Sequence, residues 1–180
     1  MVIELNGDYD MTAAQEFDLQ ASAMPAVTIY SDGSFKPALG TGGYGTIMTC
    51  NGYSRFFYGG FVGTSNNAME LMGTLSALRA LTCPCRITIM SDSQYVVKGI
   101  NAYLLKWKAN NWRKSDGGVI ANRELWIEMF YYTQYHIINA VWVKGHSACF
   151  GNSICDNLAT IGTYRVAGIE DIPGGLLDRV

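Results

Sequence analysis

Charged residues are scarce in this 180-residue chain, where Asp, Glu, Lys and Arg together make up 16% of the sequence. Globular proteins average about 25%. Against this background four acids stand out, because small, apolar or amide residues surround each of them: Asp32, Glu70, Asp92 and Asp156. We interpret these four acids as candidate functional residues.

Long apolar runs and targeting signals are also missing. No apolar stretch approaches the roughly 18 residues that a membrane span requires. The first 23 residues lack the basic start and apolar core of a signal peptide, and no internal repeat is visible. We therefore expect a cytoplasmic, monomeric protein with no membrane partner, and the length suits one domain with a full core.

Cysteine and histidine do not form a recognisable metal or disulfide pattern, although the chain has five cysteines and two histidines. Cys83 and Cys85 are separated only by Pro84, which is too close for a relaxed disulfide, and no second pair with histidine completes a zinc motif. We interpret the cysteines as reduced structural thiols. His136, which precedes a predicted strand, is interpreted as structural.

The net charge of −2 conceals an uneven distribution. Residues 1–23 contain five acids and no base, and residues 166–180 are also acidic. Residues 24–165 contain twelve Lys and Arg against seven Asp and Glu, a net charge of +5. We expect a flexible acidic extension (1–23), a folded central domain (24–165) and a C-terminal tail (166–180). A basic domain suits a polyanionic partner, although the acidic ends are also compatible with simple solvated tails.

Periodicity predicts an α/β domain. The expected strands are VTIYSD (27–32), YGTIMTC (44–50), SRFFYGGFV (54–62), RITIMSD (86–92) and HIINAVWVKGH (136–146). Asn51-Gly52 predicts a type I′ hairpin between the second and third strands, and a glycine-rich connection, GSFKPALGTGG, follows the first. Helices are expected over 65–81, 93–101, 122–135 and from 152 onward. This order predicts a mixed sheet with helices on its faces.

Asp32 and Asp92 close two of these predicted strands. Carboxylates at the ends of adjacent strands converge and repel unless a cation neutralises them, so the pattern favours a divalent-metal phosphoryl-transfer site. Each acid also has a local structural interpretation: Asp32 in an Asx-turn, Glu70 as a solvated first-turn acid, Asp92 as an N-cap, and Asp156 in a capping box with Ser153.

Five motifs in register resemble the type 1 ribonuclease H family of the bacterial, handle-containing kind, from about Val27 to Tyr164. They are Asp32-Gly33-Ser34, the NNAMEL run containing Glu70, DSQYV (92–96), WVKGH (142–146) and Asn152-x-x-Cys155-Asp156, with a Trp-bearing handle before the fourth. The resemblance implies a five-stranded mixed sheet of order 3-2-1-4-5, with strand 2 antiparallel. It also implies endonucleolytic cleavage of the RNA strand of RNA–DNA hybrids, with two Mg²⁺ (or Mn²⁺) ions, in primer and hybrid removal during replication.

The resemblance also implies a role for each site residue. Asp32 would be shared by both ions, and Asp92 would orient one ion and the attacking water. Glu70 would ligate a metal and face the RNA 2′-hydroxyl, and Asp156 would complete the coordination of the other ion. His146, in a Gly- and Ser-rich loop, would shuttle protons or aid product release.

Hybrid binding is expected to involve small polar residues and the handle (98–115). By the resemblance, the predicted contacts are Gly33, Ser34, Ser65, Asn66, Asn67, Gln94, Tyr103, Lys106, Trp107, Lys108, Trp112 and Asn152. Helix N-capping fits Ser65 or Asn66 equally well, and helix packing fits the handle aromatics. Ala38 and Ala68 replace a usual amide and a usual Arg, which predicts weaker hybrid binding.

Two other functions remain open at this point. One is a nuclease or strand-transferase of the same fold that acts on DNA. The other is a non-catalytic module that binds hybrids, against which the presence of all four acids argues.

Overall fold

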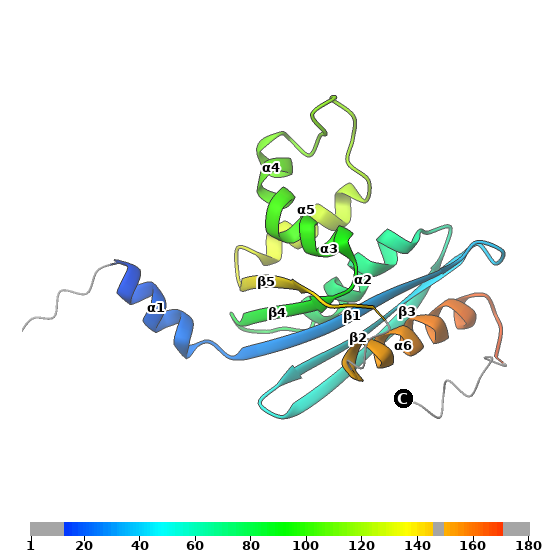
Figure 1. Ribbon diagram of the computed structural model, residues 1–180, viewed down its shortest axis with the longest axis horizontal. Coiled ribbons are helices and arrows are strands. Elements are labelled where there is room, and N and C mark those ends of the chain that lie inside the picture. The colour runs from blue at the N-terminus through cyan, green and yellow to red at the C-terminus, as the bar shows by residue number, and fades with distance from the viewer. Residues whose placement is uncertain (1–12, 146–149, 171–180) are drawn as a thin grey trace, which may run out of the picture.

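The computed structural model describes residues 13–145 and 150–170 and contains one five-stranded sheet (Figure 1). Its strands are β1 (Ala26–Lys36), β2 (Thr41–Cys50), β3 (Tyr53–Val62), β4 (Arg86–Ser91) and β5 (Ile137–Trp142). The spatial order is β3-β2-β1-β4-β5, with β2 antiparallel to both neighbours and β1, β4 and β5 parallel. The predicted order and the antiparallel second strand are confirmed.

The first hairpin corrects the sequence prediction. β1 continues four residues past Asp32 to Lys36, and β2 already begins at Thr41. The connection predicted as a loop contributes Gly43 to the paired strand β2, and a helix packs closely against both Gly43 and Gly45. A Cβ on Gly43 or Gly45 would lie 2.2 or 2.1 Å from a backbone oxygen of that helix, and glycine in a strand often marks such an approach.

The second hairpin agrees with its prediction. Asn51 and Gly52 have φ values of 50° and 80°, the positive values that a type I′ turn requires at both central positions. This turn sets the register of β2 against β3, in which Cys50 pairs with Tyr53.

The helices lie near their predicted places. They are α2 (Asn66–Leu78), α3 (Gln94–Lys98), α4 (Leu104–Ala109), α5 (Arg123–Tyr132) and α6 (Phe150–Val166). A π-helical turn, η1 (Gly99–Tyr103), joins α3 to α4, so the helix predicted to end near 101 continues to Ala109. Gly99 permits this arrangement, because a Cβ there would lie 2.0 Å from the Trp126 indole of α5.

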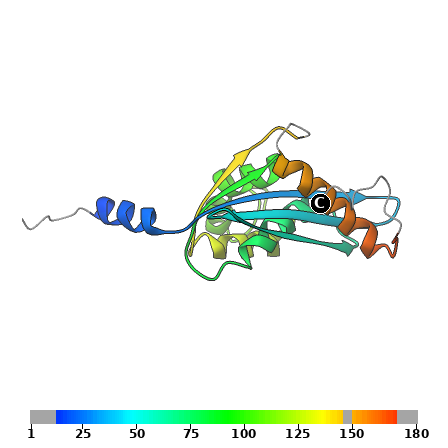
Figure 2. The same cartoon turned by 90° about the horizontal axis from the view of Figure 1, so that it is seen from below.

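Helices lie on both faces of the sheet (Figure 2), and an apolar layer lies between the sheet and the helices on each face. Alternation along β1 separates the two layers: Val27 and Ile29 join the larger core with α2 and α5, whereas Tyr30 packs against the smaller core under α6. Ile154 and Leu158 supply the α6 side of that smaller core. Helices therefore cover both faces of β1, and residues at the end of β1 can meet side chains from α2 and from α6.

Residues Ala13–Ala23 form helix α1, which projects away from the sheet beyond the start of β1 (Figures 1 and 2). Its apolar residues follow no helical period, so the sequence predicted no helix, but Ala, Gln, Glu and Leu are strong helix formers. None of the helices in 13–145 and 150–170 combines the length and apolarity needed to cross a membrane.

Candidate functional site

Three carboxylates from three different elements meet at one end of β1 and β4. Asp32 lies in β1, Glu70 in α2 just after its first turn, and Asp92 directly after β4. β1 and β4 are parallel neighbours that pair Tyr30 with Met90, so Asp32 and Asp92 stand at the same level. One oxygen from each acid lies within 4.8 Å of the other two. The predicted convergence of these three acids therefore occurs.

Glu70 reaches the cluster because α2 lies very close to β1. A Cβ on Gly33 would be 2.5 Å from the Glu70 backbone nitrogen, so only glycine allows this approach. The buried Ser31 and Thr74 hydroxyls, 3.0 Å apart, tie the same strand and helix together one turn further on. Ser65 caps α2, and its side chain accepts a hydrogen bond from the Ala68 N–H (3.3 Å).

Burial and mutual repulsion make two of these carboxyls weak acids. Asp32 is 8% exposed and Glu70 is 5% exposed. Burial, with the charges of Asp92 and Asp156, raises the pKa of Asp32 to about 7, against the effect of the Gly33 N–H bond. Burial, with Asp32 and Asp92, raises the pKa of Glu70 to about 9. Without a cation, the folded protein therefore retains protons at this site at neutral pH.

The local structural interpretations of the four acids do not hold. Glu70 is buried rather than solvated, and the N-cap of α3 is Ser93 rather than Asp92. α6 begins at Phe150, so Ser153 lies inside it and cannot start a capping box. Asp32 accepts a bond from the Gly33 N–H (2.8 Å), but β1 runs on without a turn.

Asp156 stands farther from the other three acids. It is half-buried on α6 and does not belong to the group whose oxygens lie within 4.8 Å of one another. Its charge nevertheless helps to raise the pKa of Asp32. The fourth predicted carboxylate thus faces the cluster from the opposite layer of the sheet.

Three further residues fix the position of Asp92. Asn152 is 3% exposed and donates its amide N–H to Asp92 Oδ2 (3.4 Å). Trp142 Nε1 donates to the Asp92 backbone oxygen (3.0 Å). A Cβ on Gly145 would lie 2.5 Å from Asp92 Oδ2. Sequence reasoning gave no role to Trp142 or Gly145, although both lie in the WVKGH motif.

A profile of the ribonuclease H family matches residues 24–164. The chain belongs to the ribonuclease H family. A ribonuclease H from Ralstonia nicotianae is 42% identical over 139 residues, which is 77% of this chain and 92% of that protein. A ribonuclease HI from Haemophilus ducreyi is 39% identical over 149 residues, or 83% of this chain and 97% of that protein.

Solved structures agree with the family assignment. The crystal structure of LC9-RNase H1, described as a type 1 RNase H with the type 2 active-site motif, superposes with a TM-score of 0.69 at 25% identity. The match covers 78% of this chain and 72% of that one. An N-terminal RNase H domain from Mycobacterium tuberculosis, solved as a maltose-binding-protein fusion, superposes with a TM-score of 0.59 at 20% identity. The match covers 80% of this chain and 96% of that one, and it shows the shared fold.

The donor atoms of this ribonuclease H cluster fit a divalent metal ion. All three close ligand atoms are carboxylate oxygens, which hard cations prefer. Glu70 Oε2 is buried and has no hydrogen-bond partner among the described residues. A cation beside Asp32 and Glu70 would oppose the repulsion that raises their pKa values.

The other predicted contact residues differ in accessibility. Ser65, Asn66, Asn67 and Gln94 are exposed. Asn66 Nδ2 donates to Glu70 Oε1 (3.3 Å), which links an exposed amide directly to the carboxylates. Gly33 and Ser34 are half-buried, and Asn152 is buried. His146 lies outside the described residues.

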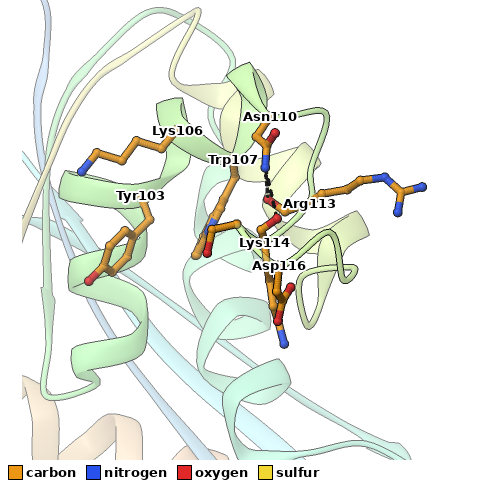
Figure 3. Close-up of a pocket in the computed structure, with 8 residues that line it drawn as sticks. Tyr103, Lys106, Trp107, Asn110, Arg113, Lys114 and Asp116 are labelled. Atoms are coloured by element: carbon orange, nitrogen blue, oxygen red, sulfur yellow. Dashed lines mark hydrogen bonds between the residues drawn. The ribbon is translucent and has the colours of Figure 1, made fainter.

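The handle of this ribonuclease H carries a basic pocket of about 540 Å³ (Figure 3). Its lining residues are Tyr103, Lys106, Trp107, Asn110, Arg113, Lys114, Ser115 and Asp116. Asn110 Nδ2 donates to the backbone oxygens of Arg113 (3.0 Å) and Lys114 (3.2 Å), so it closes the loop on one side. The lining thus has three cations against one acid.

The handle aromatics also pack within the protein. Trp107 stacks with Tyr103 (centroids 5.6 Å apart) and contacts Trp126 (5.0 Å). Trp112 contacts Phe130 of α5 edge-on (5.9 Å). Tyr103 is 43% exposed, so it presents the most accessible ring face among these residues. Trp107 and Trp112 therefore both pack against other side chains of the protein. Their contact with the substrate stays a prediction.

Proposed function

We propose that this chain is an endonuclease that hydrolyses the RNA strand of RNA–DNA hybrids with two Mg²⁺ ions, or Mn²⁺ in their place. The observation that carries the proposal is the approach of Asp32, Glu70 and Asp92 oxygens to within 4.8 Å in a family member. One chain contains the whole cluster, which supports catalysis by a monomer. Removal of primers and stray hybrids during replication is the cellular role we infer.

Each carboxylate has a proposed task. Divalent ions supply water activation and stabilise the charge that develops on the phosphoryl oxygens. Asp32 would serve both ions, Asp92 one, and Asp156 the other, while Glu70 would bind metal and face the RNA 2′-hydroxyl. A water oxygen bonds to phosphorus as the bond to the 3′-oxygen breaks, and that oxygen takes a proton. The products carry 5′-phosphate and 3′-hydroxyl ends.

Asn152 and Trp142 support this chemistry by holding Asp92. The Asn152 amide binds its carboxylate and the Trp142 indole binds its backbone oxygen. Since a residue held through both its carboxylate and its backbone loses little orientational freedom on binding, these contacts preorganise the site. We propose that His146 acts on the proton of the leaving oxygen or on product release.

Recognition of the hybrid falls to the exposed polar residues beside the carboxylates. Asn66, Asn67 and Gln94 are placed on α2 and α3 with exposed side chains, and amides can read 2′-hydroxyls across a shallow minor groove. Ser65, Gly33 and Ser34 complete this surface. The requirement for 2′-hydroxyls makes the RNA strand the one cleaved.

The handle is proposed to hold the DNA strand. Lys106, Lys108 and the pocket cations would neutralise phosphates, and Tyr103, with Trp107 and Trp112 behind it, would pack on deoxyribose. Lys106→Ala should weaken hybrid binding and lower the slope of log K against log salt by about 0.9. Arg86→Ala, at the opposite end of β4, is the matched control and should leave that slope unchanged.

One cleavage experiment tests the catalytic proposal. A duplex with differently labelled RNA and DNA strands is incubated with the protein in Mg²⁺ or in a chelator. Loss of the RNA strand alone, only in Mg²⁺ and abolished by Asp32→Asn, is expected. Asp18→Asn, an exposed acid on α1, is the control and should cleave normally.

The other outcomes identify the competing functions. Cutting of the DNA strand would indicate a DNA nuclease or strand-transferase of the same fold. Hybrid binding with no cutting of either strand would indicate a non-catalytic module. Either result would refute the proposal.

A further inference from the structure

Two thiols lie close together at the end of β4 opposite to Asp92. Cys83 and Cys85 flank Pro84 directly before β4, and their Sγ atoms are 4.0 Å apart. Cys83 is exposed and Cys85 is 2% exposed; both are free thiols. In Figure 1 this is the side on which the parallel strands β4 and β5 begin. The pair has no part in the carboxylate chemistry.

The backbone holds the buried thiol in a fixed position. The Cys85 N–H donates to His136 Nδ1 (3.2 Å), and the Ile137 N–H donates to the Cys85 carbonyl (3.0 Å). The Cys85 thiol itself lies 3.2 Å from the Cys83 carbonyl oxygen, to which it donates. Pro84 has a restricted φ, so the two Cβ atoms keep their relative placement without a ligand.

The sulfur separation suits a bridging metal ion better than a disulfide. With metal–sulfur bonds of about 2.3 Å, two thiolates stand ~3.8 Å apart at a tetrahedral angle and ~4.0 Å apart at a trigonal one. A disulfide requires about 2.05 Å, and the three-residue segment would have to close by nearly half its present sulfur–sulfur distance. An ion can therefore bind with little movement of Cys83 or Cys85.

An apolar pocket of about 390 Å³ gives access to this place. Its lining residues are Leu81, Thr82, Cys83, Pro84, Tyr131, Tyr132, Tyr135 and His136. His136 is excluded as a ligand through Nδ1, because that atom already accepts the Cys85 N–H. Burial lowers the pKa of His136, so the ring stays neutral with its proton on Nε2. Sulfur atoms and an apolar wall favour a soft ion over Mg²⁺.

We propose that Cys83 and Cys85 form a two-thiolate site for a thiophilic d¹⁰ metal ion of the Cu(I), Zn²⁺ and Cd²⁺ class. On binding, both S–H bonds break, two metal–sulfur bonds form, and two protons pass to solvent with no change of oxidation state. Because a free cysteine thiol has a pKa of about 8.5 and is protonated at neutral pH, the proton release should be measurable.

Cd²⁺ is the probe for the test, because thiolate–Cd²⁺ bonds absorb in the ultraviolet whereas carboxylate–Cd²⁺ bonds do not. The full chain is reduced, stripped of metal and titrated with Cd²⁺ without oxygen, in excess Mg²⁺ that occupies the carboxylates. One ion per chain and release of two protons are expected. Cys83→Ser, which changes an exposed side chain, should raise the Cd²⁺ dissociation constant at least about tenfold.

Cys50→Ser is the matched control, since Cys50 lies near Cys85 at the end of β2 but outside the pair. It should keep the wild-type affinity and absorbance. Equal loss in Cys50→Ser and Cys83→Ser would refute a two-thiolate site, as would an absorbance that Cys83→Ser leaves unchanged. Glutathione disulfide provides a second check: a Cys83–Cys85 disulfide formed with no detectable Cd²⁺ binding by the reduced protein would also refute it.

Discussion

Replacing Glu70 by glutamine should stabilise the metal-free protein, and increasingly so as the pH rises. Glu70 is 5% exposed, and burial with the charges of Asp32 and Asp92 raises its pKa from 4.5 to about 9. Glutamine has nearly the same shape and cannot ionise. Its amide can also occupy the position beside Asn66, whose Nδ2 donates to Glu70 Oε1.

The sign of the effect follows from proton binding. Between pH 4.5 and about 9, the folded protein keeps a proton on Glu70 that the unfolded chain releases. Glu70 therefore does not lower the free energy of unfolding of the wild type below pH 4.5. As the pH rises toward 9, it lowers that free energy progressively. Each pH unit is worth up to about 1.4 kcal/mol, so between pH 5 and pH 8 the variant should gain at most about 4 kcal/mol on the wild type. Asp32 and Asp92 are unchanged in the variant, so the difference between the two proteins reports on Glu70.

Urea unfolding in a chelator at pH 5, 6, 7 and 8 measures this difference. The control is Glu124→Gln, which makes the same chemical change at a side chain that is 79% exposed, where a substitution typically changes stability by less than about 0.5 kcal/mol. Parallel stability curves for the wild type and Glu70→Gln from pH 5 to pH 8 would refute the argument, because they would mean that Glu70 binds its proton equally in both states.

Adding Mg²⁺ should narrow the difference in stability between Glu70→Gln and the wild type. An ion that binds only the folded protein stabilises it by about 2.7 kcal/mol at one hundred times its dissociation constant. The wild type should gain this energy in full, and Glu70→Gln should gain less because it lacks one carboxylate ligand. Equal gains would show that Glu70 does not bind the ion.

Three further predictions concern residues around the site and the handle. Gly145→Ala should lower the hybrid cleavage rate at least about tenfold, measured at saturating Mg²⁺, since its Cβ would lie 2.5 Å from Asp92 Oδ2. Trp142→Phe should cost about 1 kcal/mol in urea unfolding, because it removes the 3.0 Å indole bond to the Asp92 carbonyl. Gly99→Ala should cost about 3 kcal/mol or more, because its Cβ would lie 2.0 Å from Trp126; unchanged melting would contradict this packing.

The sheet and the carboxylate cluster were predictable because their signals are local. Asn51 and Gly52 specify a type I′ turn by themselves, and Asp92 follows an apolar strand whose neighbour also carries an acid. The residues alone therefore indicated a mixed sheet and the meeting of Asp32 with Asp92, whereas the strand order was implied by the family resemblance. Glu70 was placed there by the family resemblance, and its burial depends on packing against Gly33 that no local pattern reveals.

Other features depend on contacts between distant parts of the chain. Gly43 was predicted to lie in a loop, but in the structure it stands in β2 and, with Gly45, makes room for α6, which begins more than a hundred residues later. The π-helical turn at Gly99 depends on Trp126 of α5. In both cases glycine is selected by a partner that sequence periodicity cannot identify.

The spacing of Cys83 and Cys85 illustrates the same limit at the level of ligand chemistry. A disulfide was excluded from sequence because one residue separates the thiols, and a zinc motif because no second pair with histidine completes it. Neither argument addresses whether the two sulfur atoms point the same way. The contacts of Cys85 with His136 and Ile137 decide that question, and they come from the start of β5 and the residue before it, about fifty residues later.

The strand β4 thus connects two ligand sets of opposite chemical character. Carboxylate oxygens stand at its C-terminal end with Asp92, and thiols stand at its N-terminal end with Cys85. Hard ions prefer the first and soft ions the second, so Mg²⁺ and a thiophilic ion should not compete for one place. The six residues of β4 separate the two sets by about 20 Å, which is far beyond the reach of direct ion–ion repulsion at physiological salt. Occupation of the thiol pair can then influence the carboxylates only through the intervening protein, of which β4 and α2 are the nearest elements in the chain.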